Sequence, residues 1–307
     1  MSNGDILVIG SMNMDLVVQT GRYPDKGETI IGKDFDQIPG GKGANQALAV
    51  GKLGGSVSFI GACGNDNFGD ELLSSLKTGG VNVDNVFRVE ENTGIAAITV
   101  EEDGDNRIIV VSGANSKLSS SMIDKLEDEI KEVEAILLQM EIPLKTIVHT
   151  IELAHQYQTT VILDPAPAQE LPEDIYEQID YLLPNEGELE LLLQDYNLTT
   201  TQEQVDQLLD WGVGTILLTR GKNGIILYTK GRQEHYKAIE VEAVDTTAAG
   251  DSFAGAFAYG LQQGWSEEKA IKFGNQVAAL VVTKLGAQSS LPTIEDVEEF
   301  KQERGLE

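Results

Sequence analysis

Short, uninterrupted apolar runs recur along the chain and alternate with helical patterns. The first run, Ile6–Ile9 between Asp5 and Gly10, is typical of a strand buried on both faces of a parallel sheet. Further runs of this kind lie at residues 57–60, 135–138, 161–163, 181–183 and 215–218. Between them, apolar residues recur at helical spacing. This alternation predicts an α/β fold: a doubly wound, mostly parallel central sheet with helices on both faces.

Two stretches interrupt the alternation. Residues 15–20 and 29–31 are candidate short strands, and residues 95–100 and 107–111 flank a turn-forming run at 101–106. We expect these strands to form a small β-sheet lid from inserted segments at about 12–39 and 93–112, although they could equally extend the main sheet at one edge. The candidates for an exposed apolar face of this lid are Val17, Ile30, Ala97 and Ile109.

The last third of the chain begins with a hairpin pattern at 225–228 and 234–237 and then turns helical. Helices are expected at residues 249–263, 267–284 and 293–304. The sequence contains no repeat, no low-complexity tract and no linker rich in Pro, Gly or Ser. We therefore expect residues 1–307 to form a single domain.

Charge and cysteine content exclude several classes of function. The 307 residues include 50 acidic and 22 basic side chains, a formal net charge of −28. Such a charge disfavours binding to nucleic acid or to an anionic membrane surface. A single cysteine, Cys63, leaves no internal disulfide or cysteine cluster for zinc. The N-terminus has no basic leader and no apolar run reaches about 20 residues, so we expect a cytoplasmic protein.

A glycine-rich segment precedes the first helical pattern. In Gly40-Gly41-Lys42-Gly43-Ala44-Asn45-Gln46-Ala47, backbone N–H groups and a cation can meet a polar ligand at a helix N-terminus. Its spacing matches neither a dinucleotide fingerprint nor a P-loop. A loop that merely needs glycine conformations would give the same pattern.

A second small-residue segment opens the long helix expected after residue 248. In Asp245-Thr246-Thr247-Ala248-Ala249-Gly250-Asp251, outward-pointing N–H groups and the helix dipole would stabilise negative charge. Asp251 stands at the head of this segment. A carboxylate there is also a common helix stabiliser, so position alone does not assign it a catalytic role.

Polar side chains follow several of the expected strands. Asn13 and Asp15 come after the first strand, Glu141 after the strand ending near residue 138, and Asn185 with Glu188 after the strand ending at 183. Open α/β sheets bind ligands at the carboxyl ends of their strands. These residues indicate one shared cleft, although Asn13 and Asp15 alone would also suit a polar turn.

The Gly-Ser-Met-Asn-Met-Asp, Gly-Gly-Lys-Gly-Ala-Asn-Gln-Ala and Asp-Thr-Thr-Ala-Ala-Gly-Asp segments together resemble the signatures of the PfkB-type sugar kinases, in particular of the members that act on ribose. The likeness extends over essentially the whole chain. It implies ATP-dependent phosphorylation of D-ribose at its 5-hydroxyl, with Asp251 as general base and Ala248, Ala249 and Gly250 as the anion hole. On this resemblance the sugar-binding residues are Asn13, Asp15, Gly41, Lys42, Asn45, Glu141 and Asp251.

The same resemblance implies a nucleotide site and two kinds of cation. It assigns ATP binding to Asn185, Thr219, Arg220, Gly221, Lys222, Asn223, Gly224, Gly250 and Asn275. Some relatives carry histidine in place of Asn275, beside the adenine. Glu188 would organise Mg²⁺ through water, and a monovalent K⁺ activator would bind near Asp245, Thr247, Val281, Lys284, Gly286 and Ser290. Two lids cover each other in such kinases, which implies a homodimer.

Two other functions fit the same residues. The nearest is a kinase for deoxyribose or another pentose, because pocket shape decides between these sugars. A sugar-binding regulator that kept the fold and lost turnover belongs to a different class. A base next to an anion hole is of no use to a pure binder, so Asp251 and Gly250 favour the enzyme.

Overall fold

The computed structural model describes residues 5–102 and 104–306. The ends of the expected 1–307 domain and Asp103 of the expected 101–106 turn lie outside the described residues. The strands are β1 (Ile6–Ile9), β2 (Asn13–Gln19), β3 (Asp34–Gly40), β4 (Val57–Ile60), β5 (Ala62–Gly64), β6 (Phe87–Val89), β7 (Gly94–Val100), β8 (Asn106–Val111), β9 (Ala135–Leu138), β10 (Thr160–Leu163), β11 (Tyr181–Leu182), β12 (Thr215–Thr219), β13 (Ile225–Thr229) and β14 (Arg232–Tyr236).

Helices connect most of these strands and complete the C-terminal third. They are α1 (Lys42–Lys52), α2 (Asn67–Thr78), α3 (Ser120–Ile123), α4 (Glu127–Glu132), α5 (Leu144–Tyr157), α6 (Glu186–Leu192), α7 (Thr201–Asp210), α8 (Ala249–Gln262), α9 (Glu267–Val281) and α10 (Ile294–Arg304). None of the helices formed by the described residues is long and apolar enough to cross a membrane.

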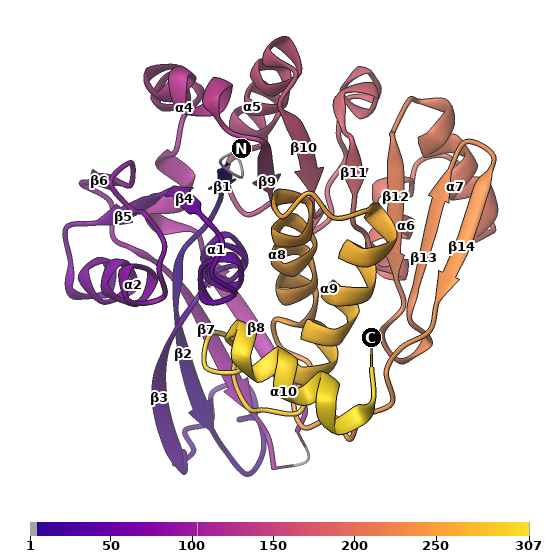
Figure 1. The fold of residues 1–307 in the computed structure, drawn as a ribbon. Helices are drawn as coiled ribbons and strands as arrows, with labels where there is room; N and C mark the ends of the chain where they lie inside the picture. Colours follow the sequence, from indigo (N-terminus) through magenta and orange to yellow (C-terminus); the bar gives the residue numbers. More distant parts are fainter. Residues whose placement is uncertain (1–4, 103, 307) are drawn as a thin grey trace.

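The main sheet has the strand order β14-β13-β12-β11-β10-β9-β1-β4 (Figure 1). Its strands pair in parallel except around β13, which runs antiparallel to both of its neighbours. The alternating side chains of β1 belong to two cores: Ile6 and Val8 belong to the core that includes residues of α1, α8 and α9, whereas Leu7 and Ile9 belong to the core that includes residues of α5 and α7. The predicted doubly wound α/β fold, with helices on both faces of the sheet, is confirmed.

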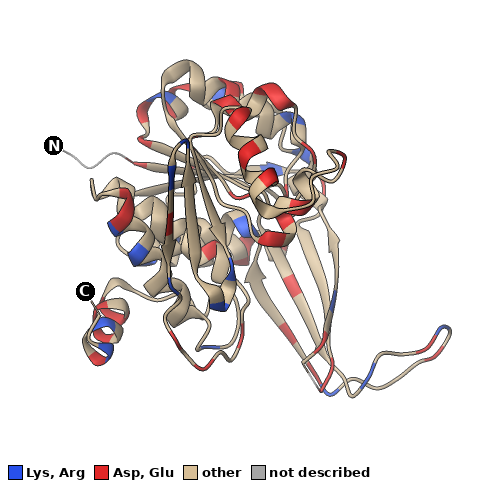
Figure 2. Ribbon diagram, turned by 90° about the vertical axis from the view of Figure 1, so that its right-hand side faces the viewer, with Lys and Arg blue, Asp and Glu red and all other residues tan. Residues whose placement is uncertain are grey.

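A separate four-stranded sheet, in the order β3-β2-β7-β8, projects from one side of the main sheet (Figure 2). It does not extend the edge of the main sheet. The expectation of a strand at residues 29–31 is wrong, because these residues follow the surface without pairing and the side chain of Ile31 is 94% exposed. On this side β2 pairs instead with β3. Most side chains of β3 are exposed, so its sequence lacks the apolar pattern that predicts a strand.

The register of this sheet also corrects the expected apolar face. Ala97 pairs with Ile109, and Leu16 pairs with Ala97, so these three side chains share one face. Val17 pairs with Ile98 and lies on the opposite face. Ile30 lies outside the sheet. Every residue of the edge strand β8 is exposed, so apolar groups reach solvent on both faces.

Candidate active site

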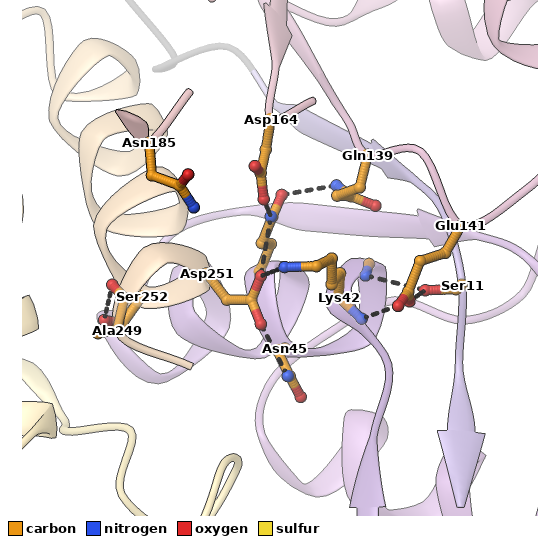
Figure 3. Close-up of polar contacts among 12 residues, drawn as sticks. Ser11, Lys42, Asn45, Gln139, Glu141, Asp164, Asn185, Ala249, Asp251 and Ser252 are labelled. Atoms are coloured by element: carbon orange, nitrogen blue, oxygen red, sulfur yellow. Dashed lines mark hydrogen bonds and ion pairs between the residues drawn. The ribbon is translucent and has the colours of Figure 1, made fainter. Parts of the chain in front are cut away.

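Asp251 lies in the first turn of α8 and is only 5% exposed. Asn45 donates its amide Nδ2 to one carboxylate oxygen of Asp251 at 2.9 Å, and Gln46 donates Nε2 to the other at 3.1 Å. The ammonium of Lys42 lies 3.8 Å from the second oxygen (Figure 3). All three donors come from the start of α1, so the glycine-rich segment and the second small-residue segment meet at one carboxylate.

Close packing of α1 against α8 makes this meeting possible. A Cβ atom at Gly255 of α8 would lie 2.7 Å from the Gln46 carbonyl and from the Ala49 methyl. At the start of α1, Gly41 has a φ of 92°, a conformation that side chains disfavour. A Cβ there would lie 2.7 Å from the backbone of Met12 and Asn13. The glycines therefore bring the two helices and the β1–β2 connection together.

The N-terminus of α8 begins at Ala248, a non-glycine residue in the left-handed region with a φ of 60°. The Ala249 N–H turns back to the Thr246 carbonyl at 3.2 Å. The N–H groups of Gly250 and Asp251, in the same turn, have no acceptor within the helix. Among the described residues, a Cβ at Gly250 would meet nothing within 4 Å, so the space before this turn is open. This geometry suits a bound anion.

A cavity of about 190 Å³ lies in front of this turn. It brings together residues that the sequence assigned to different roles: Lys42, Asn185, Glu188, Thr219, Ala248, Ala249, Gly250 and Asp251. Its lining does not include Arg220, Gly221, Lys222, Asn223 or Gly224, which follow β12, nor Asn275. Asn275 lies on α9, lines a separate cavity of about 650 Å³, and donates Nδ2 to the Lys237 carbonyl at 2.7 Å.

The expected sugar-binding residues meet on the other side of Lys42. Glu141 accepts hydrogen bonds from the Ser11 hydroxyl at 2.5 Å and from the Lys42 backbone N–H at 3.2 Å. Asn13 accepts a hydrogen bond at 2.8 Å from Asn115, whose side chain also bonds both backbone groups of Met12. Asn13 and Glu141 line a cavity of about 370 Å³. The carbonyl oxygen of the Asn45 side chain is buried and has no partner among the described residues, so it can accept from a ligand hydroxyl.

Several carboxylates lie close together around Lys42, and burial and mutual repulsion raise the pKa values of two of them. Burial, with the charges of Glu141 and Asp251, raises the pKa of Asp15 to about 7. Burial is also the main cause that raises the pKa of Asp164, with Asp251 adding to the effect and Lys42 opposing it. In turn Asp251 raises the pKa of Lys42 above its ordinary value, so this side chain remains a cation. Lys42 is thus a cation that offsets the negative charge of Asp251, Asp164 and Glu141.

Among the K⁺ candidates, Asp245 contacts Thr247 and Gly286. Its two oxygens accept hydrogen bonds from the Thr247 N–H at 2.9 Å, the Thr247 hydroxyl at 2.6 Å and the Gly286 N–H at 2.9 Å. Burial alone would raise the pKa of Asp245, but these hydrogen bonds lower it below its ordinary value. Val281 accepts from the Lys284 N–H at 3.1 Å, and the Ser290 hydroxyl donates to the Ala287 carbonyl at 2.8 Å. The hydrogen bonds thus join Asp245 to Thr247 and Gly286, whereas those of Val281, Lys284 and Ser290 are local to the segment that follows α9.

The sequence missed some residues that the structure places in this site. They are Ser11, Gln46, Asn115 and Asp164, each of which contacts an expected site residue or lines the same cavity, and Gln139, which contacts Gln46. Gln139 and Asp164 follow β9 and β10 directly, the same strand-end signal that indicated Glu141 and Asn185. Asn115 lies after β8, far from any motif, and carried no such signal.

The chain is similar to known carbohydrate kinases over nearly its whole length. The model of the "pfkB family carbohydrate kinase" matches residues 3–294. A ribokinase of Schizosaccharomyces pombe is 40% identical, with 96% of each chain covered, and a deoxyribokinase of Salmonella typhimurium is 37% identical over 96% of this chain and 98% of its own.

Solved structures agree with this result. A ribokinase of Thermotoga maritima superposes with a TM-score of 0.92 at 40% identity, covering 97% of this chain and 99% of its own. An Arabidopsis thaliana ribokinase, solved with ribose and ATP, gives 0.90 at 33% identity, covering 97% and 98%. The fold and these matches define an α/β phosphotransferase. The chain belongs to the pfkB family of carbohydrate kinases, and it is an enzyme.

Proposed function

We propose that the protein transfers the γ-phosphoryl group of ATP to the 5-hydroxyl of D-ribose and releases ribose 5-phosphate and ADP. The observation that carries this proposal is the buried Asp251 carboxylate, held by two side-chain amides at the open N-terminus of α8. The ribokinase relatives support ribose as the acceptor, and the Arabidopsis structure with ribose and ATP supports the substrate pair.

Asp251 acts as the general base. The ribose 5-oxygen attacks the γ-phosphorus, the bond between that phosphorus and the bridging oxygen breaks, and the hydroxyl proton passes to Asp251. A positioned base of this kind typically contributes about 10²- to 10⁴-fold. Charge that develops on the transferred group meets the turn of Ala248, Ala249 and Gly250, as well as the cation of Lys42.

The sugar is held by Asn13, Asp15, Gly41, Lys42, Asn45 and Glu141. In its ionised form Asp15 accepts hydrogen bonds from adjacent sugar hydroxyls, and Asn45 offers its unpartnered carbonyl oxygen. Glu141 is already oriented by Ser11 and the Lys42 N–H, so it is fixed before the sugar arrives.

ATP lies along Asn185, the Thr219–Gly224 segment and Gly250, with Asn275 near the base. Asn185 caps α6 and pairs with Thr219 in an isolated bridge, which brings the two nucleotide segments into contact. Glu188 bonds the Asn185 N–H at 2.8 Å, so the capping box fixes its carboxylate at the cavity that contains Gly250.

The carboxylates of this cavity fit Mg²⁺. The described residues contain no cluster of three or more His, Cys, Asp or Glu that would enclose a metal by themselves. Mg²⁺ keeps several waters and is usually bound through one or two carboxylates and substrate phosphates, and Glu188 suits that role through water. When bound, the ion neutralises charge on the phosphates.

The oxygen-rich group around Asp245 fits a monovalent cation, and we assign K⁺ to it. Asp245 joins the turn that precedes α8 to the loop after α9. A cation held there by Asp245, Thr247, Val281, Lys284, Gly286 and Ser290, mostly through backbone carbonyls, fixes the turn that precedes the anion hole. It touches no substrate, so it should raise kcat more than it changes the affinity for ribose.

The four-stranded sheet is the lid over the sugar, and two lids cover each other in a homodimer. Asn13 and Asp15, both sugar ligands, lie at the N-terminal end of β2 in this sheet. Apolar side chains of the same sheet, including Phe35, Ile108, Ile109 and Val110, are half exposed or more. A surface of this kind on an otherwise charged protein requires cover, and an edge strand such as β8 invites pairing.

The buried, unpaired Cys63 fits a reducing compartment, and we place the enzyme in the cytoplasm.

A kinase for deoxyribose is the second candidate, because the deoxyribokinase relative is nearly as similar as the ribokinase one. Turnover measured by coupled ADP release across a panel of pentoses separates the candidates. We expect ribose to give the highest kcat/KM. A higher value for deoxyribose would favour the second candidate, and ribose binding without ADP release would favour a regulator.

A further inference from the structure

Gln46 lies between two buried carboxylates. Its side-chain nitrogen donates to Asp164 at 2.7 Å and to Asp251 at 3.1 Å. Gln46 is fully buried, and Asp164 and Asp251 are 6% and 5% exposed. A primary amide has two N–H hydrogens, so Gln46 uses one on each carboxylate. The amide therefore fixes the position of Asp251 on α8 relative to a second acid, Asp164, directly after β10.

The direction of this amide is set from its other end. Gln139, directly after β9, donates its own Nε2 to the Gln46 carbonyl oxygen at 2.6 Å. Gln139 is fully buried as well, and space for it exists because a Cβ at Gly10 would lie 2.0 Å from its Oε1 atom. A flipped Gln46 amide would aim its oxygen at two carboxylates and its NH₂ group at another NH₂ group. The observed orientation instead gives both ends of the Gln46 amide a hydrogen-bond partner of the right kind.

We propose that Gln46 is a positioning residue for the general base, and that Gln139 acts through Gln46 by holding its amide in the productive direction. The proposal rests on the proposed function, in which Asp251 is the base. Asn45 and Gln46 hold the two oxygens of Asp251 from one helix, so neither oxygen can rotate away from the sugar hydroxyl. Displacements of about 1 Å at a reacting group can cost about 10²-fold in rate.

Two substitutions and their combination test the proposal. Gln46→Met removes both donated bonds while keeping a flexible side chain of similar length, and Gln139→Met removes only the restraint on the amide. We expect Gln46→Met to lower kcat about 10- to 100-fold, with less than about threefold change in the KM values for ribose and ATP. Gln139→Met should lower kcat less, by about 3- to 10-fold. The double variant should be no worse than Gln46→Met, because Gln139 acts only through Gln46.

Gln262→Met is the matched control. Gln262 is a buried glutamine on the same helix as Asp251, and it donates to the Ser56 carbonyl at 2.7 Å, away from the site. Its loss should lower the melting temperature and leave kcat unchanged. If Gln46→Met proves too unstable to purify, Gln139→Met against Gln262→Met still decides, since only the former should lower kcat at unchanged KM.

Three results would overturn the proposal. They are normal kcat in Gln139→Met, additive losses in the double variant, and a loss confined to the KM for ribose, which would make Gln46 a binding residue. Asp251→Asn measured alongside identifies the source of a failure. Normal turnover in that variant refutes the base itself, whereas a large loss there together with additive glutamine effects leaves the base in place and refutes the action of Gln139 through Gln46.

Discussion

Replacing Asp15 with asparagine should stabilise the free protein at neutral and alkaline pH. In the folded chain the pKa of Asp15 rises from 3.8 to about 7, chiefly by burial and then by the charges of Glu141 and Asp251. Between these two values the folded state binds a proton that the unfolded state does not. The free energy of unfolding therefore falls as the pH rises through this window, and it stops falling above about pH 7. An asparagine side chain has no such proton, so the variant escapes this loss.

The size of the effect follows from the same pKa. Each pH unit inside the window changes the free energy of unfolding by at most about 1.4 kcal/mol for one proton. From pH 5.5 to 7 the limit is about 2 kcal/mol, and because Asp15 keeps some contact with solvent we expect about 1 kcal/mol. For a chain of 307 residues that corresponds to a melting temperature difference of roughly 1–2 °C.

Thermal unfolding of both proteins without ribose, from pH 5.5 to 8.5 at constant ionic strength, measures this effect. Asp15→Asn should gain stability relative to the wild type up to about pH 7 and keep a constant advantage above it, while its affinity for ribose falls. Asp36→Asn, an exposed carboxylate on β3 of the same sheet, is the control and should follow the wild type. A stability difference that does not change with pH would refute the reasoning.

Three further predictions address the anion hole, the cation and the lid. Gly250→Ala should leave the melting temperature unchanged or slightly raised, because a Cβ there meets no described atom within 4 Å. It should nevertheless lower kcat at least about tenfold, because the methyl group fills the space that the ligand occupies. Unchanged turnover would contradict an anion site. Exchanging a tetraalkylammonium salt for KCl at constant ionic strength should raise kcat, with NaCl less effective, and equal rates in both salts would remove the specific site. The wild type should sediment as a dimer at micromolar concentration and Ile109→Asp as a monomer, and a monomeric wild type would contradict the lid interface.

The main sheet was predictable because burial on both faces leaves a clear signal. Runs such as Ile6–Ile9 contain no polar residue, and no other element of similar length suits them. The four-stranded sheet was harder to define. β3 is an exposed edge strand that pairs with β2 through its backbone, and its side chains show no alternation of apolar and polar residues that would predict a strand. The face that Val17 occupies depends on register, which a single short strand does not specify.

The site divides in the same way. Asp251 and Asn45 belong to the two small-residue segments on which the family resemblance rests, so the resemblance singled them out, and the structure brings them into contact. The roles of Gln139 and Asp164 depend on which residues of α1 lie against the ends of β9 and β10, and that follows only from the packing of the helix on the sheet. Asn115 reaches Asn13 across 102 positions of sequence, a contact that no local pattern records.

The central claim is that Asp251 takes the proton of the sugar hydroxyl. Asp251→Asn keeps the shape of the side chain and removes the base, so kcat for ribose should fall by about 10²- to 10⁴-fold. Because the nucleotide contacts lie on other residues, the affinity for ATP, measured by calorimetry on the same variant, should stay nearly unchanged. Turnover close to that of the wild type would contradict the assignment of Asp251 as the base.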